Sequence, residues 1–130
     1  MKEKVKEWLE AARLDCEAAL ALLDNEELTP IISFHSHQCI EKCFKAIIED
    51  SDNNVPRIHD LVRLYHLIED QINISLDIEI LEDLSKLYID SRYPGSLGFM
   101  PYGKPTKNDA LKFYNFANSV YIALLEMFNN

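Results

Sequence analysis

The chain has 130 residues, of which 13 are basic and 22 acidic, so its formal net charge at pH 7 is −9. This length is typical of one domain, and a content of 48% hydrophobic residues is too high for a disordered chain. An acidic chain is a poor general ligand for duplex DNA, because neutralisation of phosphates dominates such binding. Composition therefore predicts a single domain over residues 1–130 and argues against a DNA-coating protein, while leaving room for a local basic site.

Neither a membrane span nor a secretion signal is predicted. No apolar run approaches the roughly 20 residues that a spanning helix needs, and the charged segment from Met1 to Trp8 lacks the apolar stretch of a signal peptide. The three cysteines, Cys16, Cys39 and Cys43, cannot all pair, and none lies in a Cys-x-x-Cys motif. We therefore expect a cytoplasmic protein with reduced cysteines.

Apolar residues recur at three- and four-residue steps in the first half of the chain, which predicts two long helices. The first covers about residues 2–24. The second runs to about Asp50 and begins at Thr29, which suits an N-cap, followed by Pro30 in the first turn. A loop rich in Asp, Asn and Ser follows at residues 51–56.

Three further helices are predicted in the second half. A short one follows Asp60, a plausible cap, and another spans about residues 77–91. The last begins at Thr106, which forms a capping box with Asp109 in place of the usual Glu or Gln. Because no segment alternates with period two, the sequence predicts an all-α fold, an up-and-down four-helix bundle with one additional short helix.

The second helix has an unusually wide apolar face, roughly 200° of arc, so we expect it to be covered from two sides. The remaining arc holds Gln38, Glu41, Lys42 and Lys45. This polar stripe either faces water or lines a groove in which the lysines meet phosphate. His37 falls within the apolar arc, as a neutral hydrogen-bonded core residue or as a proton carrier.

The same helix carries His35, Cys39 and Cys43 at four-residue steps. On a straight helix the first and last of these are about 12 Å apart. That is too far for three ligands to reach one zinc ion, so we predict no metal site here.

The segment before the last helix combines basic and aromatic side chains. Arg92, Lys104 and Lys107 lie close in sequence to Tyr93 and to glycines and prolines. Such a loop suits a phosphorylated or base-containing ligand, or it packs its rings on the bundle and solvates its lysines. Arg92 either holds a phosphate bidentately or bonds helix-terminal carbonyls or an acidic side chain.

Three motifs together resemble the HEPN domain family. They are Gln38-x-x-Glu41-Lys42-x-x-Lys45-Ala46, His59-Asp60-Leu61 and Tyr88-x-x-x-Arg92-Tyr93-Pro94. The resemblance implies a small helical bundle, commonly a homodimer. It also implies one of two functions: pairing with a minimal nucleotidyltransferase, often as a toxin–antitoxin system, or metal-independent ribonuclease activity. The family's ribonucleases carry an Arg followed, after four to six residues, by a His.

That ribonuclease motif is absent from this sequence. The only forward pairs within ten residues join Arg57 to His59, Arg57 to His66 and Arg63 to His66, and none leaves four to six residues between. The chemistry needs a His to handle the 2′-hydroxyl proton and an Arg to neutralise the phosphate. The resemblance therefore points to the subgroup that pairs with a nucleotidyltransferase.

The sequence thus predicts a binding module rather than an enzyme, with no catalytic residue, metal or cofactor. We expect it to bind nucleotide, RNA or another substrate, with His37 as a candidate proton carrier. The predicted ligand-binding residues are Arg92, Tyr93, Lys42, Lys45, Gln38, Glu41, Lys104 and Lys107. The alternatives are a ribonuclease toxin with a non-standard active site and a plain assembly domain without a ligand.

Overall fold

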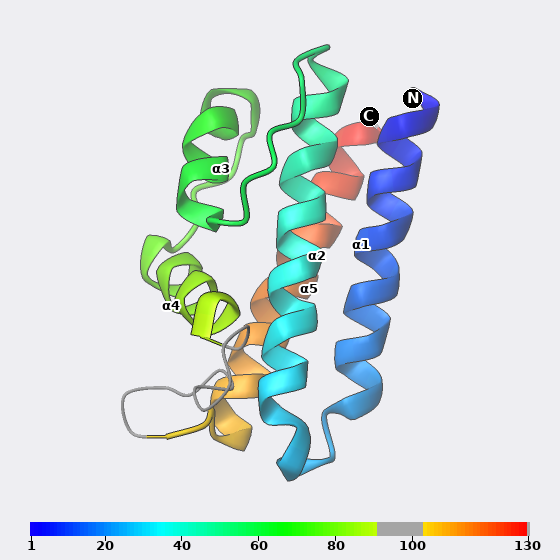
Figure 1. Ribbon diagram of the computed structural model, residues 1–130. Coiled ribbons are helices and arrows are strands. Elements are labelled where there is room, and N and C mark those ends of the chain that lie inside the picture. Colours follow the sequence, from blue (N-terminus) through cyan, green and yellow to red (C-terminus); the bar gives the residue numbers. More distant parts are fainter. Residues whose placement is uncertain (91–102, 130) are drawn as a thin grey trace.

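The computed structural model describes residues 1–90 and 103–129 (Figure 1). All its regular elements in these residues are helical, as the sequence predicts. Two short 3₁₀ turns, η1 (Glu26–Leu28) and η2 (Glu69–Gln71), accompany the α-helices. The α-helices are α1 (Glu3–Leu22), α2 (Thr29–Asp50), α3 (Leu61–Ile68), α4 (Ile78–Asp90) and α5 (Lys107–Phe128).

Helix α2 is the central element. It contacts all four other α-helices, with α1 and α5 packed against each other and α3 packed against α4. The three long helices lie side by side, α1 opposite in direction to α2 and α5, so both termini lie at one end of the molecule (Figure 1). Fourteen of the 22 residues of α2 are buried, which confirms the expectation of cover from two sides.

Two predicted helix starts are confirmed in atomic detail. The Asp60 carboxylate accepts hydrogen bonds from the backbone N–H groups of Val62 at 2.9 Å and Arg63 at 3.3 Å. At α5, the Thr106 hydroxyl accepts from the Asp109 N–H, and the Asp109 carboxylate accepts from the Thr106 N–H. Both caps satisfy backbone donors that lack partners within the helix.

The predicted cap at Thr29 is wrong. Thr29 is already helical, and its buried hydroxyl donates to the carbonyl of Pro105 at 2.6 Å. The cap lies one turn earlier, where the Asn25 side chain accepts from the Glu27 N–H and starts η1. A tertiary bond to the segment before α5 has thus replaced the local one.

The core is built around α2 and closed by side chains from every other helix. Its largest fully buried members include Phe44, Leu64, Leu84 and Phe113. Truncating a side chain of this kind to alanine typically costs about 2–5 kcal/mol. No helix in the described part of the chain is long and apolar enough to cross a membrane.

The cysteines belong to this core as free thiols. Cys16, Cys39 and Cys43 are all buried. A hydrogen bond with Cys39, together with burial, raises the pKa of the Cys16 thiol. A protonated thiol is a poor nucleophile and a poor metal ligand, so Cys16 acts as a packing group. Cys39 and Cys43 are buried in the same core and pack there as small apolar side chains.

Candidate functional site

The polar stripe of α2 contains a buried ion pair. Glu41 Oε2 accepts from Lys45 Nζ at 3.0 Å, and the two side chains are only 5% and 6% exposed. Lys45 Nζ also lies 5.9 Å from the centre of the Trp8 ring. A charge at such depth is tolerated only when it is paired and hydrogen-bonded. The stripe is therefore covered here rather than open to water.

His59 covers this pair from the outside. Its Nδ1 donates to Glu41 Oε1 at 3.0 Å, and its ring is 44% exposed. Glu41 thus has one oxygen on Lys45 and the other on a histidine that reaches the surface. The arrangement links the second helix to the segment that leads into α3.

His37 is held in a defined orientation directly beside this pair. Its Nε2 is 2.8 Å from the carbonyl oxygen of His59, so Nε2 carries the proton and donates. Its ring stacks on Tyr88, with centroids 4.3 Å apart and planes 7° from parallel. Burial lowers the pKa of His37, which favours the neutral ring. The geometry is that of a hydrogen-bonded core histidine.

The remaining predicted residues of the stripe also have partners. Gln38 Oε1 lies 3.2 Å from His37 Nδ1; since that nitrogen is an acceptor in this tautomer, the amide is better placed with its NH₂ turned toward the ring. Lys42 Nζ donates to Asp15 Oδ2 at 2.6 Å. The other oxygen of Asp15 accepts from His35 Nδ1 at 2.9 Å.

Asp15 therefore joins α1 to α2 through two charged or chargeable partners. Burial raises the pKa of its carboxyl, but the hydrogen bonds from His35 and Lys42 outweigh that effect, so the pKa lies below its usual value. Asp15 was not among the residues predicted from the sequence. Both α2 lysines thus already have a carboxylate partner, and a phosphate would have to compete with it.

A surface cleft of about 560 Å³ opens next to the Glu41–His59 contact. It lies between the segment that precedes α3, the first turn of α3 and the end of α4. Seven residues line it: Arg57, Ile58, His59, Asp60, Arg63, Tyr88 and Ile89. It is the place where the buried polar network reaches the surface.

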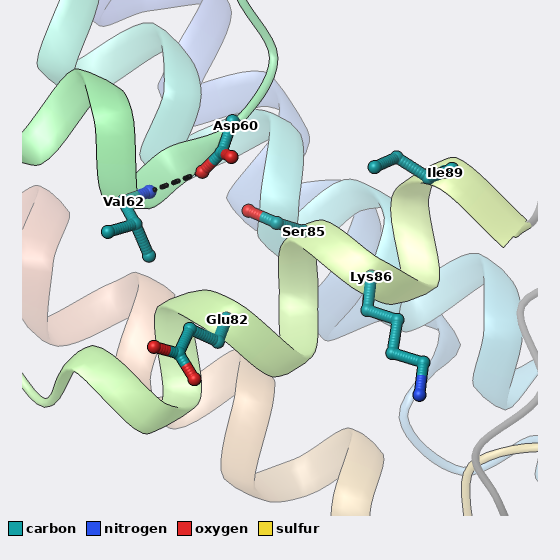
Figure 2. Close-up of a pocket in the computed structure, with 6 residues that line it drawn as sticks. All are labelled: Asp60, Val62, Glu82, Ser85, Lys86 and Ile89. Carbon is teal, nitrogen blue, oxygen red and sulfur yellow. Dashed lines mark hydrogen bonds between the residues drawn. The ribbon is translucent and has the colours of Figure 1, made fainter.

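A second hollow of about 400 Å³ shares Asp60 and Ile89 with this cleft (Figure 2). Between the two, the start of α3 is fixed from both sides. Asp60 caps it (dashed line in Figure 2), and the Leu61 N–H donates to the Ser85 hydroxyl of α4 at 2.9 Å. The Lys86 side chain points away from these groups, so it contributes little charge beside Asp60.

The structure does not bring all the predicted ligand residues together. Lys104 and Lys107 flank Pro105, which is bonded to Thr29 at the first turn of α2. Sixteen helical residues, about 24 Å, separate Thr29 from Lys45 along the axis. Lys104 and Lys107 therefore lie near the start of α2, away from the buried ion pair. Arg92 and Tyr93 lie outside the described residues.

Two residues of the cleft, Arg57 and Arg63, were not among the predicted ligand residues. In the sequence they were considered only as partners of His59 and His66 in the ribonuclease motif. They were excluded because no Arg and His of these pairs are separated by four to six residues. A more useful signal was their position two residues before and four after His59, on either side of a helix cap. Cations so placed lie on one surface when the cap holds the turn.

The comparisons with known proteins concern the whole chain. The model of the HEPN domain matches residues 5–127. No curated protein matches. A crystal structure of TT1696 from Thermus thermophilus is similar at a TM-score of 0.75 and 19% identity, over 96% of this chain and 98% of that one. A crystal structure of ST0689, an archaeal HEPN homologue, has a TM-score of 0.67 and 24% identity, over 98% of each chain. These similarities establish a shared helical architecture.

Proposed function

The chain belongs to the HEPN domain family, and we propose on that basis that it is a binding module that partners a minimal nucleotidyltransferase in a toxin–antitoxin-like pair and binds a nucleotide. We further propose that it forms a homodimer, as the family resemblance implies, and that it acts in the cytoplasm, where its cysteines stay reduced. One observation carries the binding role. The α2 residues Glu41 and Lys45 form a buried ion pair, and Glu41 holds His59, which lines a surface cleft. Because both side chains are paired, they shape a binding surface and are not free to react.

The nucleotidyltransferase partnership is supported by the family and by the missing ribonuclease spacing. A co-expression experiment tests it. The chain and a nucleotidyltransferase from the neighbouring reading frame are purified together, and the mass of the complex is measured by light scattering. We expect a stable hetero-oligomer. Two proteins that elute separately at micromolar concentration would contradict the partnership. The mass of the chain purified alone tests the homodimer, which should have twice the mass of one chain.

The second candidate, a ribonuclease with a non-standard site, is favoured by one observation. His59 lies in the same cleft as Arg57 and Arg63, so a proton-transfer group and phosphate-binding cations share one surface. Incubation of the protein with RNA in the presence of a chelator separates the candidates. Cleavage that survives chelation and disappears in His59→Ala would establish the ribonuclease and displace the binding module.

A further inference from the structure

The two arginines of the cleft are available to an anion. Arg57 and Arg63 are both exposed, and neither forms an ion pair within residues 1–90 and 103–129. Arg13 on α1 differs, since it pairs with Glu10 and lies near Glu17. Guanidinium groups without a carboxylate partner are well suited to bind phosphate through two parallel hydrogen bonds.

The carboxylates nearest the cleft are already engaged. Asp60 accepts from two backbone N–H groups at the start of α3, and Glu41 accepts from Lys45 and His59. Each carboxylate is thus stabilised by groups of the protein itself. Two arginines against the one carboxylate of Asp60 give the cleft lining a positive balance in a chain of net charge −9, which favours anionic ligands.

His59 is the most constrained of the lining side chains. Its carbonyl accepts from His37, and its Nδ1 donates to Glu41. Nε2 is left as the ring nitrogen without a partner in the described part of the chain. A side chain held in this way loses little entropy when a ligand binds.

The other lining residues are apolar or aromatic. Ile58, Tyr88 and Ile89 share the cleft with the arginines, and Ile89 is 52% exposed. A volume of about 560 Å³ lies in the usual range for small-molecule sites. We infer that the cleft binds a nucleoside triphosphate, with the phosphates on Arg57 and Arg63 and the base against Ile58 and Ile89. This inference rests on the proposed nucleotide-binding function and assigns it a site.

The test compares two charge-matched double variants by calorimetric titration with ATP, tripolyphosphate and adenosine. Arg57→Gln/Arg63→Gln removes two charges from the cleft, and Lys104→Gln/Lys107→Gln removes two from the start of α5. We expect the arginine variant to weaken ATP and tripolyphosphate binding by about tenfold or more, and the lysine variant to stay within about twofold. Arg57→Lys/Arg63→Lys keeps the charge but removes the paired guanidinium donors that bind phosphate bidentately. It should give an intermediate loss of ATP affinity.

Each opposite result is informative. If only the lysine variant loses ATP binding, the cleft is the wrong site but nucleotide binding stands. If the wild-type chain binds neither ATP nor tripolyphosphate at millimolar concentration, both the cleft assignment and the nucleotide-binding function are overturned. The nucleotidyltransferase partnership is tested separately, by co-purification. Equal affinity for tripolyphosphate and ATP, with none for adenosine, would overturn the base contact with Ile58 and Ile89. Thermal melting confirms that every variant is folded.

Discussion

Glu41 and His59 are 18 residues apart in the chain and meet through a hydrogen bond of 3.0 Å between Oε1 and Nδ1. The contact joins two of the three motifs that resemble the HEPN family. It also completes the coordination of a buried carboxylate whose other oxygen is held by Lys45. The two motifs therefore have a shared structural role, which is to bury an ion pair under the segment that leads to α3.

Replacing Glu41 with Gln should destabilise the fold strongly. The substitution keeps the shape but leaves the Lys45 ammonium, 6% exposed, without its counter-charge. Breaking a buried pair on one side typically costs about 3–5 kcal/mol. Urea denaturation at pH 7 should show this as a large fall in the midpoint.

The control for Glu41→Gln is Glu10→Gln, which breaks an exposed pair with Arg13 and should leave the midpoint unchanged within error. The double variant Glu41→Leu/Lys45→Met should recover most of the lost stability, because it removes both charges together. A Glu41→Gln midpoint equal to that of the wild type would show that Lys45 is solvated and that the pair is not buried in solution.

Asp15 should make the fold sensitive to strong acid. Its pKa is held below the usual 3.8 by His35 and Lys42 despite burial. A carboxyl with a depressed folded pKa contributes stability that is present above the unfolded pKa and is lost as pH falls through the folded value. Wild-type stability should therefore decline below about pH 4 more steeply than that of Asp15→Asn, as measured by thermal melting across pH. Parallel curves would show that the carboxyl is not shifted.

His37 should produce a separate loss of stability at milder acidity. Its folded pKa is lowered by burial from the usual 6.5, so between the two values the unfolded chain binds a proton that the folded chain does not. Stability is complete above pH 6.5 and falls below it, by up to about 1.4 kcal/mol per pH unit, until the folded pKa is reached. Subtracting the pH profile of His37→Gln isolates this contribution. If the difference in stability between the two proteins does not change between pH 5 and 6.5, the pKa of His37 is not lowered in the folded state.

The sequence predicts what depends on near neighbours. The caps at Asp60 and Thr106 were predictable because each uses backbone groups within three residues. The cap at Thr29 was not, since the competing acceptor, Pro105, is 76 residues away. Whether a side chain has a local or a distant partner is decided by packing, which residue spacing does not record.

The same limit applies to the candidate site. A helical wheel places Glu41 and Lys45 on a polar stripe, and their mutual contact four residues apart is predictable. Their burial is not, because it depends on where the segment around His59 lies relative to α2. Similarly, Lys104 and Lys107 fit a phosphate site by composition, yet the bond from Thr29 to Pro105 anchors their segment at the first turn of α2.

Asp60 allows the helix cap and the charge of the cleft to be separated. Asn is nearly as good as Asp at an N-cap, whereas Ala costs about 1 kcal/mol. We therefore expect Asp60→Asn to keep the stability of the wild type and Asp60→Ala to lose about that amount in urea denaturation. Because Asp60→Asn removes the negative charge that lies beside Arg57 and Arg63 in the cleft, it should also tighten ATP binding, by about twofold to fivefold at low salt. The gain should shrink as salt is added. If Asp60→Asn weakens ATP binding while the protein stays fully folded, the carboxylate itself contacts the ligand, and the arginines are not the dominant charge in the cleft.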